Sequence, residues 1–259
     1  MTRRRTLAVG LEILVPVLLL LGWQLYTVHA HSFKFPRLST ILVDFKKEWL
    51  FAHVGSDLVP SLERIGAGFA IATLVGIALG VLLGMSTVLR RIATPHIEYW
   101  RAMPPPALLP ISIILLHSIQ NRQKVAFIAF FCVFPVLLNT IDAVRGIDPT
   151  LIDTARSYRV PWQQRVWRIV LPSALPQIVA GMRNSLALAV IMMVLSEYFS
   201  SSSGVGYQLL ISKNTFQFGP MWAAIVLIGL QYYLLNALFL LVERRLLAWH
   251  RGWRAATPQ

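Results

Sequence analysis

The sequence predicts an all-α integral membrane protein with about six transmembrane helices, forming a single membrane-spanning domain over residues 1–259. First, 56% of its 259 residues are hydrophobic and only 14% are charged, whereas a soluble domain carries about 25% charged residues. Second, several apolar runs approach the roughly 20 residues that a helix needs to cross a bilayer. Third, most Lys and Arg residues lie at the ends of these runs or in the segments between them. Such a composition leaves too little polar surface to cover a water-soluble protein of this size.

The apolar runs give the expected spans: 7–28, 65–85, 100–119, 125–141, 178–196 and 221–242. The second, fourth and sixth contain no Asp, Glu, Lys or Arg. The second span also has small residues at steps of four, namely Ala72, Gly76, Gly80 and Gly84. Because small residues let helix backbones approach closely, we expect this ridge to pack tightly against another helix of the same subunit.

The basic residues predict the orientation of these spans. With the N-terminus inside, the inner segments 1–6, 86–98, 143–177 and 243–259 hold 14 Lys and Arg, and the outer segments hold 7. By the positive-inside rule, both termini are expected in the cytoplasm. Outside, residues 38–51 mix apolar and charged residues at helical spacing, which predicts an interfacial helix.

The first span has an alternative interpretation as a signal peptide cleaved after Ala30. Arg3, Arg4 and Arg5 precede an apolar run of about 22 residues, however, and the apolar region of a signal peptide has about 7–15. Retention of the span is therefore favoured.

The net charge of +13 does not indicate nucleic-acid binding, because no basic stripe interleaves with aromatic residues. Attraction to anionic membrane lipid accounts for it. The single cysteine, Cys132, excludes an intrachain disulfide, and no Cys/His cluster has metal-ligand spacing. No phosphate-binding GxxxxGK[ST], HExxH or GxSxG motif is present. We therefore expect no catalytic residues, no metal and no cofactor.

Three features near the spans are candidates for a translocation path. Pro104, Pro105 and Pro106 are incompatible with a regular helix, and non-helical backbone at membrane depth survives only within protein or beside a water-filled cavity. Pro105 therefore either borders a path or belongs to an irregular cytoplasmic entry. Arg183 and Glu197, near opposite ends of the fifth span, either face a path or reach the two interfaces.

The inner segment 143–177 is patterned rather than a simple connector. Asp148 is a good N-cap and Pro149 suits the first helical position, which predicts a short helix. Pro161 excludes the α region at Val160 and opens a second short helix, expected to end near Leu171-Pro172. The segment is too polar to span a membrane.

At this point the chain resembles the permeases of binding-protein-dependent ABC importers, in the nitrate, sulfonate, taurine or bicarbonate branch. The resemblance covers nearly the whole chain. The matching stretches are 105–110 (PPALLP), 134–139 (FPVLLN), 144–149 (VRGIDP), 203–207 (SGVGY) and the inner segment, where Asp153, Thr154, Ala155, Arg159 and Leu171-Pro172 align with the family's Glu-Ala-Ala, Gly and Leu-Pro.

The resemblance implies that the inner segment is a coupling helix docking on an ATPase subunit. Leu151, Ile152 and Ala155 are the expected anchors, with Asp153 and Arg156 at the rim. It further implies a small anionic solute and the bacterial plasma membrane. Because six helices cannot readily enclose a gated path alone, we expect a homodimer with two ATPase copies and an external substrate-binding protein. An ATP-independent secondary transporter or channel is the alternative.

The chain departs from the family at Thr154 and Arg159, and at Ser118-Ile119-Gln120, where a glycine-bearing turn is usual. Arg159 replaces a glycine that would allow a left-handed residue. Because arginine adopts that conformation at a cost, the bend is expected to come from Val160-Pro161 instead.

Overall fold

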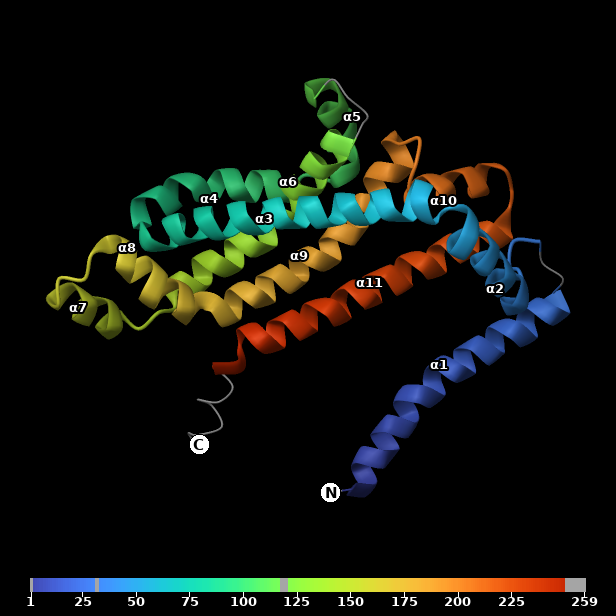
Figure 1. The fold of residues 1–259 in the computed structure, drawn as a ribbon, viewed down its shortest axis with the longest axis horizontal. Helices are drawn as coiled ribbons and strands as arrows, with labels where there is room; N and C mark the ends of the chain where they lie inside the picture. The colour runs from blue at the N-terminus through green and yellow to red at the C-terminus, as the bar shows by residue number, and fades with distance from the viewer. Residues whose placement is uncertain (1, 31–32, 117–120, 250–259) are drawn as a thin grey trace.

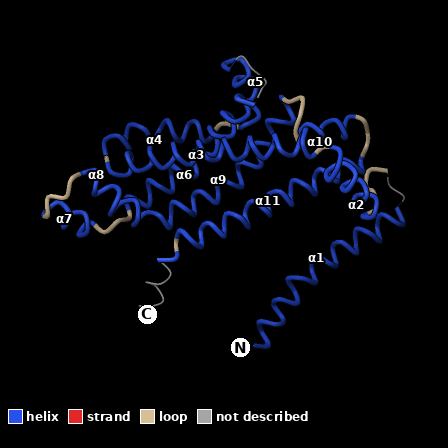
Figure 2. The backbone as a smooth tube through the Cα atoms, in the orientation of Figure 1, coloured by secondary structure: helices blue, strands red, loops and turns tan. Residues whose placement is uncertain are grey.

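The computed structural model describes residues 2–30, 33–116 and 121–249, so Ser118-Ile119-Gln120 and the end of the third expected span lie outside the described residues. Within those ranges the chain consists of helices joined by short turns, without a strand (Figures 1 and 2). The helices are α1 (Thr2–Ala30), α2 (Leu38–Lys47), α3 (Val59–Met85), α4 (Thr87–Ala102), α5 (Pro105–Leu116), α6 (Asn121–Arg145), α7 (Pro149–Ser157), α8 (Trp162–Arg165), α9 (Leu171–Ser200), α10 (Val205–Asn214) and α11 (Phe218–Leu246). The predicted all-α class is confirmed.

Four continuous helical stretches are long and apolar enough to cross a membrane: Val54–Met85, Asn121–Arg145, Trp162–Ser200 and Phe218–Leu246. They contain the second, fourth, fifth and sixth expected spans. The first expected span lies in α1, in which residues 14–29 form an apolar helix within the part whose side chains the structure describes. The third is divided between α4 and α5. The described residues thus contain four full-length spans, and the count of six stays a prediction.

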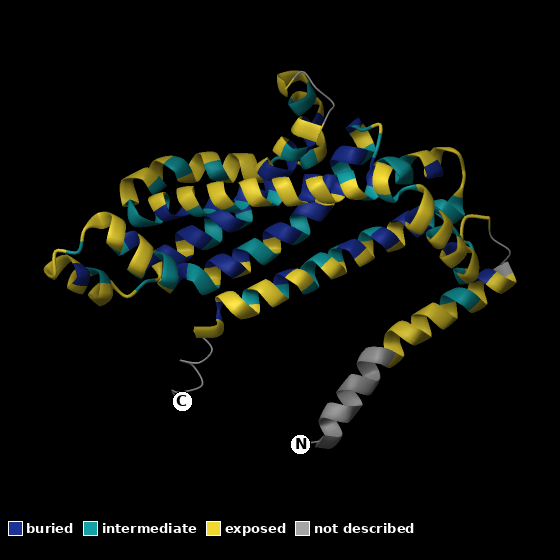
Figure 3. Ribbon diagram, in the orientation of Figure 1, coloured by how far each residue is buried: buried dark blue, intermediate teal, exposed yellow. Residues whose placement is uncertain are grey.

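The core is formed by α3, α6 and α9, whose facing sides are buried (Figure 3). The small-residue ridge of α3 lies against α6, as predicted. A Cβ added to Gly76 would lie 2.8 Å from Cβ of Val136, and Gly80 faces Thr140 in the same way one turn later. A larger side chain at these positions would force the two backbones apart.

The proline cluster interrupts the third expected span, as predicted. α4 ends at Ala102, Met103 is extended (φ −70°, ψ 132°), and α5 begins at Pro105. Most of the expected inner segment 86–98 forms α4, which lies along α3 (Figure 1). Ser86 starts this helix by accepting a hydrogen bond from the backbone N–H of Leu89. None of the residues of α4 is buried.

The two ends of the bundle carry different short helices. α7 and α8 lie at one end, whereas α2 and α10 lie at the other (Figure 1). α2 and the π-helical turn Glu48–Ala52 form the helix expected over 38–51. α1 contacts the bundle near this end, where the ring of Trp23 lies 4.7 Å from that of Trp222. Toward its N-terminus α1 diverges from the other helices (Figure 1).

Candidate functional site

The first half of the inner segment folds as its sequence predicts. Asp148 caps α7, since its Oδ1 accepts the backbone N–H of Thr150 at 2.9 Å, and Pro149 is the first helical residue. Hydrogen bonds from Thr150 hold the pKa of the exposed Asp148 carboxyl below its usual value. The carboxylate is therefore charged at neutral pH, and its negative charge stabilises the N-terminus of α7, the positive end of the helix dipole.

The bend after α7 forms differently from the prediction. Arg159 itself has a left-handed conformation, with φ +54°. The N–H of Val160 bonds to the carbonyl of Ala155 at 3.0 Å, and that of Arg159 to the carbonyl of Arg156 at 2.8 Å. These two bonds are a Schellman motif. The expectation that Arg159 avoids this region was wrong, because the two bonds satisfy carbonyls at the end of α7 and offset the conformational cost.

The second half also differs from the prediction. α8 begins after Pro161, as expected, but no helix end occurs near Leu171-Pro172. Instead a π-helical turn over Val166–Val170 connects α8 directly to α9. The ring of Pro172 would crowd the carbonyl of Arg168 in a regular α-helix. The wider π turn at this position accommodates the proline without breaking the helix.

The α7 side chains separate into two faces. Ala155 is buried, and Ile152 packs against the protein's own core beneath α7. Leu151, Thr154 and Tyr158 are exposed at helical spacing, and Tyr158 is 81% exposed. Of the expected anchors, only Leu151 therefore lies on the outward face.

Replacing Arg159 with glycine is expected to stabilise the α7–α8 bend by about 1 kcal/mol, because glycine has no Cβ penalty at positive φ. A thermal shift of the purified protein measures this, with Arg156→Gly as the control. Arg156 lies inside α7, so glycine there is expected to destabilise by about 1 kcal/mol. A loss of stability in Arg159→Gly would contradict the left-handed assignment.

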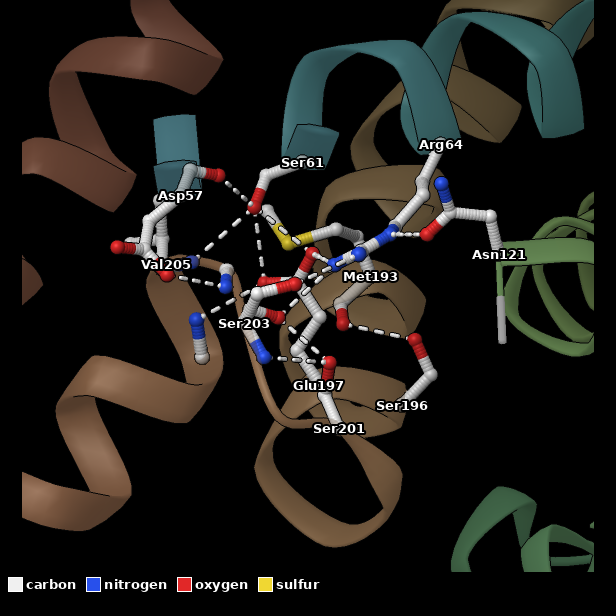
Figure 4. A network of polar contacts seen from close by, with 12 residues as sticks. Asp57, Ser61, Arg64, Asn121, Met193, Ser196, Glu197, Ser201, Ser203 and Val205 are labelled. Carbon is white, nitrogen blue, oxygen red and sulfur yellow. Dashed lines mark hydrogen bonds and ion pairs between the residues drawn. The ribbon is translucent and has the colours of Figure 1, made fainter. Parts of the chain in front are cut away.

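A buried ion pair lies at the opposite end of the bundle (Figure 4). Arg64 on α3 and Glu197 on α9 are 3% and 0% exposed, and Nη1 of Arg64 donates to Oε1 of Glu197 at 2.6 Å. The guanidinium also donates to the carbonyl of Ser203 at 3.0 Å and to Oδ1 of Asn121 at 2.9 Å. Ser61 Oγ lies 2.7 Å from Oε1 of Glu197. We call Asp57, Ser61, Arg64, Asn121, Glu197 and backbone 203–206 the outer polar network.

The network holds the start of α10 by its backbone. Glu197 accepts the N–H of Gly206 at 3.0 Å, and Asp57 accepts the N–H of Gly204 at 2.6 Å. Gly204 has φ +116°, and a Cβ there would collide with the Glu197 carboxylate. Both conditions require glycine. Glu197 is therefore enclosed by protein in this chain, and it fixes the turn between α9 and α10.

A cavity of about 410 Å³ lies half-way along α6 and α9, beside the break between α4 and α5. We call it the mid-depth cavity. Its polar lining residues are Arg101 from α4, Asn139 from α6 and Asn184 from α9, and Pro105 lies at its wall. Arg101 also pairs with Glu98 at 2.6 Å, where both side chains are about half exposed. One arginine and two asparagines thus line this cavity, half-way along two of the membrane-spanning stretches.

The predicted path residues separate accordingly. Pro105 lines the mid-depth cavity, whereas Arg183 pairs with Glu243 of α11 and Glu197 lies in the outer polar network. Arg101, Asn139 and Asn184 were not predicted from the sequence, although Arg101 next to the proline cluster is a charge beside a broken helix. Arg64, an arginine at the start of an apolar run, was not predicted either. A charge in such a position is a signal for a buried partner.

Comparison with known proteins agrees with this architecture. The chain is 31% identical over 245 residues to a candidate aliphatic sulfonates transport permease protein, SsuC, of Bacillus subtilis, covering 93% of this chain and 88% of that protein. It is 28% identical to the taurine transport system permease protein TauC of Escherichia coli, covering 96% and 92%. It is 29% identical to the bicarbonate transport system permease protein CmpB of Synechococcus elongatus, covering 75% and 67%.

A solved chain of the MetNI methionine ABC transporter, in an inward-facing conformation, has the same fold. The TM-score is 0.66 at 18% identity, and the alignment covers 73% of this chain and 94% of that chain. Residues 72–248, more than half of the chain, match the family described as binding-protein-dependent transport system inner membrane component. The chain belongs to that family, and the predicted resemblance to ABC importer permeases is confirmed.

Proposed function

We propose that this chain is the membrane-spanning subunit of an ATP-driven importer and that a small anion passes through its mid-depth cavity. The observation that supports this best is the position of the cavity beside the α4–α5 break, with Arg101, Asn139 and Asn184 facing it. Polar and charged groups at membrane depth mark solute paths. The named solutes of the relatives, which include taurine and bicarbonate, are small anions or carry an anionic group.

We infer that the path is completed by a second copy of the chain, related by a two-fold axis. α4 supports this inference, because its main contacts are with α3 and α6 and none of its residues is buried. It nevertheless carries Arg90, Arg91, Glu98 and Arg101. A helix with this charge is stable beside a bilayer when it faces a partner subunit or water rather than lipid.

ATP hydrolysis takes place in a separate subunit, and α7 couples to it. The outward face Leu151, Thr154 and Tyr158 has the i, i+3, i+7 spacing of a helix that fills a groove. Asp153 and Arg156 flank this face, paired with each other at 3.3 Å. Two ATPase copies and an external substrate-binding protein complete the assembly, whose α7 end and both termini face the cytoplasm.

Reconstitution of the chain with its ATPase and binding protein in liposomes tests this proposal. Uptake of taurine, an alkanesulfonate, nitrate or bicarbonate is expected to require ATP, and Arg101→Gln is expected to reduce it about tenfold or more, since a hydrogen bond to a charged group contributes about 1.5–3 kcal/mol. Arg91→Gln, on the same helix but outside the cavity, is the matched control. Uptake of these anions without ATP would instead support a secondary transporter or channel, and equal effects of the two substitutions would remove Arg101 from the path.

A further inference from the structure

A second polar cavity, of about 290 Å³, lies at the α7 end of the bundle. Four arginines from four different helices line it: Arg90 of α4, Arg145 of α6, Arg156 of α7 and Arg165 of α8. We call it the arginine pocket. Among the described residues, no Asp or Glu is part of its lining. The positive-inside rule explains arginines on this side of the membrane, but it does not explain why four of them converge on one cavity.

The acidic groups near the pocket compensate these charges only in part. Asp142 lies 3.8 Å from Arg145, and Asp153 lies 3.3 Å from Arg156, in both cases on the same helix with exposed side chains. Exposed pairs of this kind contribute about 0–1 kcal/mol. For Arg90 and Arg165, no ion pair is present in the part of the chain that the structure describes.

Arg165, one of these four residues, also carries an unsatisfied hydrogen-bond donor. Its Nε is buried, and within the described ranges this atom has no hydrogen-bond partner. A buried donor without an acceptor costs about 1–3 kcal/mol, and more for a charged group. An oxyanion in the pocket would reduce the repulsion among the four guanidinium groups.

We propose that the arginine pocket binds a phosphate group or a similar oxyanion. Guanidinium groups bind phosphate through paired N–H donors, and Thr87 lines the same cavity. The volume is at the lower end of the range for small-molecule sites, about 300–1,000 Å³, and therefore fits a headgroup or a small anion rather than a nucleotide. A bound oxyanion connects α4 to both halves of the inner segment, and it holds α7 and α8 against the membrane-spanning bundle.

The phosphate has two possible sources, which share this chemistry. The pocket lies where α3 and α6 end, and Val88 and Ile92, neighbours of Arg90 on α4, are 65% and 63% exposed. This apolar surface next to the pocket is compatible with the acyl chains of an anionic phospholipid. Inorganic phosphate from the cytoplasm is the other source.

The experiment measures the thermal stability of the full-length chain in a neutral detergent. Inorganic phosphate is titrated in one arm, and phosphatidylglycerol, with phosphatidylcholine as the neutral reference, is added in the other. A ligand that binds only the folded state raises Tm. For the double variant Arg90→Gln/Arg165→Gln, the concentration that gives a half-maximal shift is expected to rise at least tenfold. Arg168→Gln is the matched control, because Arg168 is exposed on the same segment outside the pocket.

Each result has a definite meaning. A shift with phosphate that the double variant weakens supports a soluble oxyanion, and a shift with phosphatidylglycerol alone supports a lipid headgroup. The proposal is overturned if neither ligand shifts Tm, or if the double variant and Arg168→Gln respond alike. It is also overturned if the double variant loses only its association with an ATPase, since the pocket would then receive an acidic side chain of that subunit. None of these results depends on which solute the mid-depth cavity transports.

Discussion

Replacing Glu197 with alanine is expected to lower the free energy of unfolding by about 3–5 kcal/mol, because it leaves the Arg64 guanidinium buried without its counter-ion. The same change removes the acceptor for the N–H of Gly206. We therefore expect a large drop in the thermal stability of the purified protein. Hydrogen exchange should also accelerate first at the start of α10, which the outer polar network holds in place.

Two further variants separate the ion pair from a general effect of mutation. Glu98→Ala removes a carboxylate of similar geometry, 2.6 Å from Arg101, but this pair is half exposed and is expected to change stability by about 0–1 kcal/mol. Arg64→Leu/Glu197→Leu removes both charges together and should recover part of the loss. If Glu197→Ala costs no more than Glu98→Ala, the ion pair does not stabilise this end of the bundle.

Replacing Gly80 with alanine is expected to destabilise the protein by about 1–3 kcal/mol, the usual cost of overpacking a core. The added Cβ would collide with the side chain of Thr140 and lie 3.1 Å from the carbonyl oxygen of Leu137. Neither neighbour can withdraw easily, because one is backbone and the other is a β-branched residue. Thermal unfolding measures the loss.

Gly66 on the same helix is the matched control, because nothing lies within 4 Å of a Cβ added there. Gly66→Ala should stabilise α3 by up to about 1 kcal/mol through helix propensity alone. The two glycine substitutions are thus expected to have opposite signs. A similar gain in stability from Gly80→Ala would show that α3 and α6 are not in close contact at Thr140.

The features that were predictable from the sequence depend on neighbouring residues. Asp148 and Pro149 predict the start of α7 because a helix cap involves only the next few residues. The four-residue spacing of Gly76 and Gly80 predicts a packing ridge because helical periodicity is local. The prolines after Met103 predict a break for the same reason. In each case the structure agrees with the local rule.

The outer polar network and the mid-depth cavity were not predictable in this way. Arg64 and Glu197 are 133 residues apart, and no local pattern indicates that they pair. Asn139 and Asn184 come from different spans and face one cavity only after α6 packs on α9. At Arg159 a local rule gave a wrong prediction. The rule disfavours a left-handed arginine, but it is only a weak local preference. The hydrogen bonds that end α7 outweigh it.

The continuity of α8 with α9 has a mechanical consequence. Because the π-helical turn replaces a break, residues Trp162–Ser200 form one helical stretch of 39 residues, about 58 Å long at 1.5 Å per residue. One end of this helical stretch lies beside α7, and Glu197 is near its other end. Over that length, each degree of tilt shifts one end relative to the other by about 1 Å. No loop interrupts this stretch, so a small tilt of α8 displaces the opposite end of the helix. That end leads into the turn that positions α10.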